Sequence, residues 1–293
     1  KTAICAEIEI TYNDGTTDII ATDESWNTAV AGPVLYADIW NGEYFDATIK
    51  DPCVYCESTT WTSAEKFNDY TCDIVDFEGE KVCVTEYIAP KSAVVYRGTK
   101  NNGTDFGEIK VAKKTVGDNC ECITLKAGQT MVLDFGEDIV GRPSLAIRAL
   151  HGTNIKCFFA EMLNDSGDKS RGNDGPKGSL YIENYRSALS RFNYVAASEN
   201  SRRQLNIIKP LHTFYGFRYI RIDSFPGGVE AAKLENFTAI VVHSQMERTG
   251  YLKSSNPLLN KLFENIVWGQ KGNFLDVPTD CPQRDERLGW TGD

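Results

Sequence analysis

Residues 2–12 set the fold class, and they read Thr-Ala-Ile-Cys-Ala-Glu-Ile-Glu-Ile-Thr-Tyr. Apolar and polar side chains alternate along this stretch, which is the pattern of a β-strand with one face buried. The apolar face would carry Ile4, Ala6, Ile8 and Ile10, and the opposite face Glu7 and Glu9. Residues 13–15, Asn-Asp-Gly, are typical of a turn. The chain is therefore predicted to open with a strand and a turn into a second apolar run.

Short runs of the same β type recur along most of the chain up to residue 247. They lie at 131–135, 144–148, 155–160, 218–222 and 237–243, and clusters of Gly, Asn and Asp separate them. Many short strands bounded by turns indicate β-sandwiches rather than alternating β/α units. We therefore predict a mainly β fold with two β-sandwich domains, at about residues 1–95 and 96–247.

The pattern changes from β to helical near residue 250. Asn256 is a typical helix cap and Pro257 suits the first helical position. Apolar residues then recur at helical spacing, at Leu258, Leu259, Leu262, Phe263, Ile266 and Val267. An apolar stripe of this kind has to pack against another element. Residues 248–293 are therefore interpreted as the start of a helical domain. With no further helices to cover it, the segment from about 270 to 293 is expected to be poorly anchored.

The composition is that of a folded protein acting on neutral ligands. Hydrophobic residues make up 41% of the 293 residues and charged residues 25%, which is ordinary for a globular chain. The net charge of -10 argues against nucleic acid or an anionic membrane as the partner. The sequence holds no apolar run of about 18 residues that could span a bilayer. A homo-oligomer is compatible with all of this.

Two sequence features raise the question of a metal. Nine cysteines, an odd number, favour reduced thiols and a cytoplasmic protein, although Cys53 and Cys56 have the spacing of half a zinc site. Residues 164–175 are rich in Asp and Asn, but no Glu closes the loop as a calcium-binding EF-hand requires. We therefore expect a solvated, mobile loop there, and neither a metal nor another cofactor.

The stretch with most chemistry is residues 277–293, which read Val-Pro-Thr-Asp-Cys-Pro-Gln-Arg-Asp-Glu-Arg-Leu-Gly-Trp-Thr-Gly-Asp. If a helix begins near Pro282, then Glu286, Trp290 and Asp293 share one stripe, at i, i+4 and i+7. Two glycines in the same stretch, at 289 and 292, weaken a helix, so a short or broken helix is an equal alternative.

Two acids on either side of an aromatic residue are typical of a sugar-binding site. Carboxylates accept hydrogen bonds from hydroxyl groups, and an indole covers the apolar face of a pyranose ring. Hydrolysis of a glycoside also needs a carboxylic acid that protonates the leaving oxygen. The alternative is an acid-rich helix start, favoured by the helix dipole, with Trp290 in a core. The residues alone leave these two interpretations open.

A resemblance adds to this interpretation. Residues 280–287 and 289–293 resemble the signature of the alpha-L-rhamnosidases of glycoside hydrolase family 78. Further stretches resemble the same family in the same order, at 23–26, 41–47, 134–141, 160–164 and 214–219. Residues 137–138 depart from the family pattern, because they read Glu-Asp where Gln-Asn is usual.

The resemblance implies an architecture and a set of roles. It implies a rhamnosidase N-terminal domain with an incomplete start, a concanavalin-like domain, and the first elements of a truncated (α/α)6 barrel, the six-hairpin glycosidase domain. By resemblance, Glu286 is the general acid of an inverting hydrolase that removes terminal alpha-L-rhamnose from glycosides. Also by resemblance, Asp280 and Asp293 would bind rhamnose hydroxyls, and Trp290 would form an aromatic wall of the sugar pocket. We expect Arg284 to orient a carboxylate. The general base would lie beyond residue 293, so the chain alone should be inactive.

Two other functions stay open on sequence grounds. A carbohydrate-binding β protein without catalysis is compatible with aromatics such as Trp40 and Trp61, although these are more often partly buried. A structural scaffold for the barrel is the other alternative. Titration of free rhamnose by calorimetry would separate them, because a binding module holds the sugar and a scaffold does not.

Overall fold

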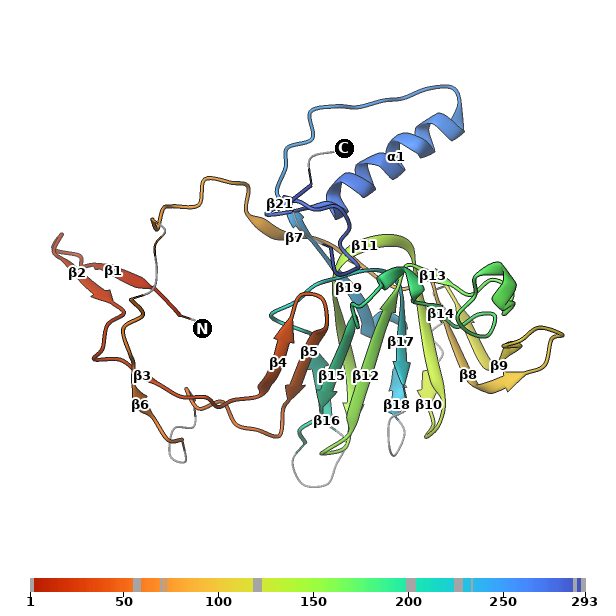
Figure 1. Cartoon of the computed structure of the whole chain (residues 1–293), viewed down its shortest axis with the longest axis horizontal. Helices are drawn as coiled ribbons and strands as arrows, with labels where there is room; N and C mark the ends of the chain where they lie inside the picture. Colours follow the sequence, from red (N-terminus) through yellow and green to blue (C-terminus); the bar gives the residue numbers. More distant parts are fainter. Residues whose placement is uncertain are drawn as a thin grey trace. The chain divides into compact units, whose positions relative to one another are not determined.

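The computed structural model describes residues 3–54, 59–68, 71, 73–117, 123–198, 204–223, 229–232, 234–286 and 289–290. The chain divides into two compact units. The smaller comprises Lys1–Pro33 and Ile49–Glu78, and the larger Val34–Thr48 and Gly79–Asp293. Figure 1 labels their elements. The domain boundaries predicted near residues 95 and 247 stay predictions.

The smaller unit contains the hairpin expected from the first residues. Strands β1 (Glu7–Thr11) and β2 (Thr17–Ala21) pair antiparallel, and β3 (Asn27–Thr28) pairs with β6 (Thr62–Ser63). The expectation that the apolar face is buried is wrong, because Ile8 is 52% exposed and Ile19 62%. Within this unit β1 and β2 form a sheet of only two strands. A strand can bury one face only where a second layer covers it.

The larger unit is built on a sheet of 13 strands. Its strands are β4 (Val34–Asp38), β5 (Gly42–Asp46), β7 (Val82–Ile88), β8 (Ser92–Lys100), β9 (Glu108–Val116), β10 (Ile123–Leu125), β11 (Thr130–Ala149), β12 (Asn154–Ala160), β15 (Arg191–Val195), β16 (Gln204–Ile208), β17 (Tyr215–Asp223), β18 (Val229–Ala232) and β19 (Phe237–Ser244). The main path runs β10-β18-β11-β17-β12-β15-β5-β4. All these pairs are antiparallel except β15 with β5.

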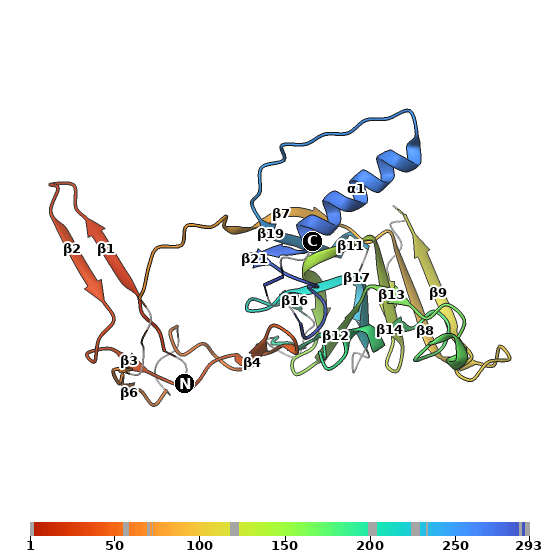
Figure 2. The ribbon, with the colours of Figure 1, turned by 45° about the horizontal axis from the view of Figure 1, so that its top comes forward.

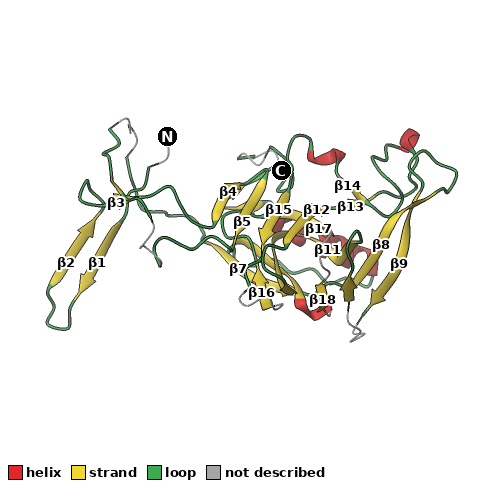
Figure 3. Cartoon of the chain, turned by 90° about the horizontal axis from the view of Figure 1, so that it is seen from below, coloured by secondary structure: helices red, strands yellow, loops and turns green. Residues whose placement is uncertain are grey.

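Strand β11 makes the sheet curl around its core. Its first residues pair with β8 and β17, whereas its last residues pair with β16 and β19, so one strand of 20 residues serves two layers. The curled sheet is visible in Figure 1 and, from below, in Figure 3. Between the layers lie fully buried side chains, among them Leu133, Phe135, Leu145, Phe159 and Phe217.

The predicted helix is confirmed. Helix α1 spans Pro257–Gly272, and the Asn256 side chain accepts a hydrogen bond from the Leu258 amide at 3.0 Å. Among the described residues it is the only α-helix. Its apolar stripe is largely uncovered, since Leu258 is 78% and Leu262 54% exposed. Trp268, near the end of α1, packs on the sheet core, and Figure 2 shows this end meeting β11.

The mainly β architecture is thus confirmed. Short elements complete it: strands β13 (Met162–Leu163), β14 (Leu180–Tyr181), β20 (Phe274–Leu275) and β21 (Val277–Pro278), and 3-10 helices η2 (Lys169–Arg171), η3 (Glu183–Tyr185) and η4 (Leu234–Asn236). None of the helices in the described ranges has the length and apolar character needed to cross a bilayer.

The acid-rich loop at 164–175 is held by its own hydrogen bonds. The Asn164 amide donates to Asp174 Oδ1 at 2.8 Å and to Leu180 O at 2.9 Å. Asp165 accepts from Arg171 and Asn173, and Asp174 Oδ2 accepts from the Ile182 amide. The acids thus accept hydrogen bonds within the loop, while the Asp165 side chain stays 59% exposed, as expected of a solvated loop. The mobility of the loop stays a prediction.

Candidate active site

The acid-rich segment from residue 277 folds as a closed loop and not as a helix. β20 and β21 form a tight hairpin, after which Thr279 forms a β-bridge with Gly289 and the Trp290 amide donates to Pro278 O at 2.8 Å. Neither the helix considered from Pro282 nor its alternative, a short or broken helix, is formed over the described residues to 286. Backbone groups at the ends of the loop pair with each other, as in a strand pair, in place of helical bonds.

The loop packs closely against the rest of the larger unit. Leu275, Thr279, Cys281 and Gln283 are all more than nine-tenths buried. The expectation of a poorly anchored segment after residue 270 is therefore wrong for the residues described. Small and buried side chains of the loop rest on the sheet, so anchoring does not depend on further helices.

The loop brings three of the predicted site residues into contact. Arg284 Nη2 lies 2.9 Å from Asp280 Oδ2 and 2.9 Å from Glu286 Oε2. Trp290 lies near the end of the loop and is 48% exposed, so part of its indole is accessible. Asp293 lies outside the described residues. One guanidinium thus holds two carboxylates at a fixed separation.

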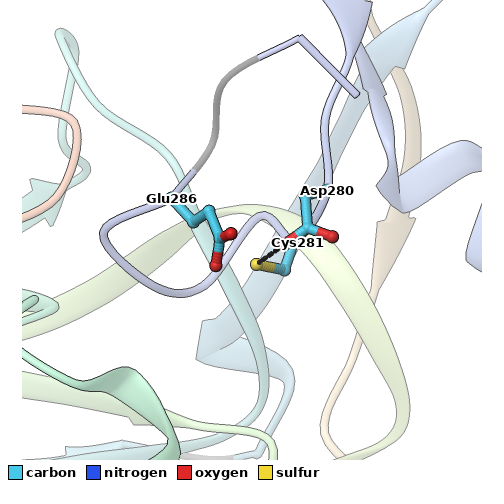
Figure 4. A group of neighbouring side chains, drawn as sticks. All are labelled: Asp280, Cys281 and Glu286. Carbon is cyan, nitrogen blue, oxygen red and sulfur yellow. Dashed lines mark hydrogen bonds between the residues drawn. The ribbon is translucent and has the colours of Figure 1, made fainter. Parts of the chain in front are cut away.

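Asp280, Cys281 and Glu286 form a compact group, shown in Figure 4. One donor atom from each lies within 4.8 Å of the others, a spacing that could hold a metal ion. Removal of the thiol from water, and then its hydrogen bond to Asp280, raise the pKa of Cys281 to about 12. A cation would have to displace this proton and compete with the Arg284 guanidinium. The group is therefore better suited to hydroxyl ligands than to a metal.

The charges of the loop are set by its hydrogen bonds. The Cys281 thiol and then the Arg284 guanidinium lower the pKa of Asp280 below its usual value. The Ser187 hydroxyl does the same for the pKa of Asp285. Both carboxylates are therefore ionised at neutral pH, and Asp280 is an acceptor for hydroxyl groups.

Sequence reasoning missed two residues of the site, Arg186 and Ser187. Arg186 Nη1 donates to Glu286 Oε2 at 2.6 Å, and the Ser187 hydroxyl donates to Asp285 Oδ2. Both follow η3, where Arg186 has φ 56 and ψ -116. A non-glycine residue in this backbone region is rare. No local pattern distinguishes the pair, since its partners lie about a hundred positions away.

The loop rests on Gly216 of β17. A Cβ atom at this position would lie 2.9 Å from Gln283 Cβ and 3.1 Å from Pro282 Cγ. The Tyr185 hydroxyl donates to Gly216 O at 2.8 Å, which joins η3 to the same point. The absence of a side chain at 216 therefore lets β17 approach the loop.

A cavity of about 370 Å³ lies beside the loop and contains a second pair of acids, Asp138 and Glu161. It is lined by residues of the sheet, α1 and the loop: Glu137, Asp138, Ile139, Val140, Glu161, Gly216, Asn265, Trp268, Gly269, Gly272, Asn273, Asp280, Cys281, Pro282 and Gln283. Burial, and then the charge of the neighbouring Asp138, raise the pKa of Glu161 to about 7. Sequence reasoning did not assign these two acids to the site.

Three family models match consecutive parts of the chain. The alpha-L-rhamnosidase N-terminal domain matches residues 1–86, and the bacterial alpha-L-rhamnosidase concanavalin-like domain matches 124–243. The bacterial alpha-L-rhamnosidase six-hairpin glycosidase domain matches 247–293. The three models therefore cover helix α1, the loop and most of the sheet, but not residues 87–123, which include β8 and β9.

Relatives along the chain agree with these matches. Alpha-L-rhamnosidases of Alteromonas sp. and Formosa agariphila are each 34% identical over 98% and 99% of the chain. The crystal structure of Streptomyces avermitilis alpha-L-rhamnosidase complexed with L-rhamnose matches 98% of the chain with a TM-score of 0.73 and 29% identity. The chain spans 27% of the first two relatives and 24% of the third.

Proposed function

Since the chain belongs to the bacterial alpha-L-rhamnosidase family, we propose that its protein hydrolyses terminal alpha-L-rhamnose from glycosides. The observation that carries the proposal is the contact of Arg284 with both Asp280 and Glu286 at 2.9 Å. This contact places two carboxylates and an accessible indole on one closed loop. The L-rhamnose complex of the Streptomyces avermitilis relative supports rhamnose as the sugar.

In the proposed mechanism Glu286 donates the proton to the leaving glycosidic oxygen. Asp280, held ionised, accepts hydrogen bonds from rhamnose hydroxyls, and Asp293 is assigned the same role. Arg284 keeps the carboxylates of Asp280 and Glu286 in place, and the exposed face of Trp290 covers the apolar side of the ring.

We further propose that the reaction inverts the anomeric carbon. Inversion needs a second carboxylate, about 6.5–9.5 Å from the first, that activates water on the opposite face of the sugar. We assign this general base to a part of the catalytic domain beyond residue 293. The chain of 293 residues alone is then inactive, because its proton donor lacks the partner that activates water.

The test compares the 293-residue chain with the full-length protein on an aryl alpha-L-rhamnoside and on an unactivated rhamnoside. Full-length protein should turn over both substrates, and the chain alone neither. Glu286→Gln in the full-length protein should lower kcat on the unactivated substrate by about 10²–10⁴-fold. Glu264→Gln, on the exposed side of α1, is the matched control and should retain full activity.

The results that would overturn the proposal are specific. Turnover by the chain alone would refute the assignment of the general base beyond residue 293. Near-normal activity of full-length Glu286→Gln would remove Glu286 as proton donor. Calorimetric binding of rhamnose by a full-length protein that hydrolyses nothing would favour the carbohydrate-binding alternative.

The compartment is part of the proposal. We propose a cytoplasmic protein, because an odd number of cysteines is a poor basis for a disulfide framework. Among the described residues, Cys5, Cys53, Cys83, Cys157 and Cys281 are free thiols.

A further inference from the structure

We propose that the cavity beside the loop binds the sugar to which the rhamnose is attached, as a neutral pyranose ring. The cavity lies between helix α1, the bulged part of β11 and the start of the loop. Its volume of about 370 Å³ is at the lower end of the range of about 300–1,000 Å³ that is typical of small-molecule sites. That this ring belongs to a rhamnoside rests on the proposed function, but the binding of a neutral sugar in the cavity does not.

The first support is the open face that α1 turns towards the cavity. Four residues of this helix line the cavity at i, i+3, i+4 and i+7, and so form one stripe: Asn265, Trp268, Gly269 and Gly272. A Cβ atom at Gly269 would have nothing within 4 Å. The lack of a side chain at this position therefore keeps the space next to the helix open.

The second support is the bulge in β11, which brings acids to the cavity. The register of β11 against β17 shifts between residues 134 and 139, and Gly136, with φ 77, permits the bulge. Residues 137–140 therefore all line the cavity, although alternate residues of a regular strand face opposite sides of the sheet. Asp138 thus reaches the same cavity as Glu161, which directly follows β12.

The third support is the chemistry of the lining. Four carboxylates line the cavity: Glu137, Asp138, Glu161 and Asp280. No three of these four lie close enough together to hold a metal ion, since the one such group among the described residues is Asp280, Cys281 and Glu286. The four acids are spread around the cavity, which suits the separated hydroxyl groups of a sugar ring. The Trp268 side chain adds an aromatic surface for the apolar face of the ring.

The charges around the cavity favour a neutral ligand. Lys91 Nζ lies 3.5 Å from Glu137 Oε1, and Arg284 Nη2 lies 2.9 Å from Asp280 Oδ2. These cations offset part of the negative charge, so little excess remains to attract a cationic ligand, while the carboxylates repel an anionic one. A carboxylate has about four lone-pair sites, so each acid can still accept a hydrogen bond from a ligand hydroxyl group.

One further acceptor of the lining lacks a donor. Gln283 lines the cavity and is 8% exposed, and its Oε1 atom has no hydrogen-bond partner among the described residues. A buried acceptor without a donor is unfavourable, and such groups in folded proteins are usually paired with protein, water or a ligand. A ligand with several hydroxyl groups supplies donors of this kind.

The cavity adjoins the proposed proton donor. Asp280 and Cys281 line it, and one atom from each lies within 4.8 Å of a carboxylate oxygen of Glu286, as Figure 4 shows. The glycosidic oxygen has to lie beside Glu286 to receive its proton. Trp290, which is assigned to the rhamnose ring, does not line the cavity. The cavity is therefore assigned to the ring on the other side of the glycosidic oxygen.

The experiment fills the cavity in the full-length protein. In Gly269→Leu the new side chain occupies the open space, and α1 should stay folded because Leu favours a helix more than Gly does. Gln270→Leu, at the next position of α1 and outside the cavity lining, is the matched control. Asp138→Ala is a second variant, which removes one acceptor and adds no bulk.

Binding is measured by calorimetry with two probes, free rhamnose and a disaccharide of alpha-L-rhamnose joined to glucose. All proteins in this titration carry Glu286→Gln, so that the disaccharide is not hydrolysed. Without a cavity substitution, the protein should bind the disaccharide more tightly than rhamnose. Gly269→Leu and Asp138→Ala should weaken disaccharide binding at least about tenfold, the effect of losing one or two hydrogen bonds. Gln270→Leu should weaken neither probe.

Three results of the titration would overturn the proposal. Equal affinity for the two probes without a cavity substitution would show that the second sugar is not bound. Unchanged disaccharide binding in Gly269→Leu would place that sugar elsewhere. Equal weakening of both probes by Gly269→Leu would place the rhamnose itself in the cavity.

Hydrolysis separates this proposal from the proposed function. In full-length protein that retains Glu286, Gly269→Leu should lower kcat/KM for the disaccharide, relative to that for an aryl rhamnoside, by at least about tenfold. If the native protein hydrolyses neither substrate, the proposed function fails, and the titration still decides whether the cavity binds the second sugar. If hydrolysis proceeds and this ratio is unchanged, the proposal fails and the proposed function stands.

Discussion

The guanidinium of Arg186 lies 2.6 Å from the carboxylate of Glu286, although 100 positions separate the two residues. Arg186 stands in a sparsely populated backbone conformation, with φ 56 and ψ -116. Such conformations persist where surrounding contacts hold them. Residues 184–187, at the end of η3, therefore help to fix the orientation of the Glu286 side chain in the loop.

Arg186→Gln should lower activity more than stability. The ion pair is partly exposed, and exposed pairs contribute only about 0–1 kcal/mol to the free energy of unfolding. Loss of the contact leaves Glu286 held by Arg284 alone, so its side chain can shift and kcat/KM of the full-length protein should fall by about tenfold or more, the effect of a small misplacement. Arg171→Gln, which breaks an exposed pair with Asp165, is the control. Equal activity of both variants would contradict the assignment.

Gly216→Ala should destabilise the fold. Its Cβ would lie 2.9 Å from Gln283 Cβ, and the loop would have to shift. Overpacking of this kind typically costs about 1–3 kcal/mol. Gly250→Ala, where nothing lies within 4 Å, should cost much less. Urea unfolding of both variants measures the difference, and equal midpoints would show that β17 and the loop are not in close contact.

The thiols should react in two classes. Cys5 and Cys53 are exposed, whereas Cys157 and Cys281 are buried, and burial raises the pKa of both buried thiols. Because the thiolate is the reactive form, an alkylating reagent near neutral pH should modify the first two rapidly. The buried pair should react only after unfolding, which mass spectrometry of the peptides can follow. Fast modification of Cys281 in the native chain would contradict the close packing of the loop around this residue.

Substitution in the apolar stripe of α1 should be tolerated by this chain. Leu262 is 54% exposed, so Leu262→Gln should change the free energy of unfolding by no more than about 0.5 kcal/mol. Leu133→Ala, in the core with no exposed surface, should cost about 2–5 kcal/mol. Thermal unfolding of the two variants provides the comparison. A large loss for Leu262→Gln would mean that a further contact covers this face in solution.

The sequence by itself determined the features that depend on neighbours along the chain. Alternation over residues 7–11 predicted a strand, and Asn256 with Pro257 predicted the start of α1, because caps and side-chain periodicity act within a few residues. The acid-rich run at 280–286 also indicated where to look for chemistry. Its resemblance to a family added roles that periodicity could not supply.

Only the tertiary structure decided which faces are buried and which distant groups meet. In the hairpin of β1 and β2 apolar and polar residues alternate as in a half-buried strand, yet the apolar side chains stay exposed. Their burial would depend on a second layer, which the alternation does not encode. The contact of Arg186 with Glu286 joins segments that are far apart along the chain. It arises because Gly216 of β17 accepts a hydrogen bond from the Tyr185 hydroxyl and packs against Pro282 and Gln283 of the loop.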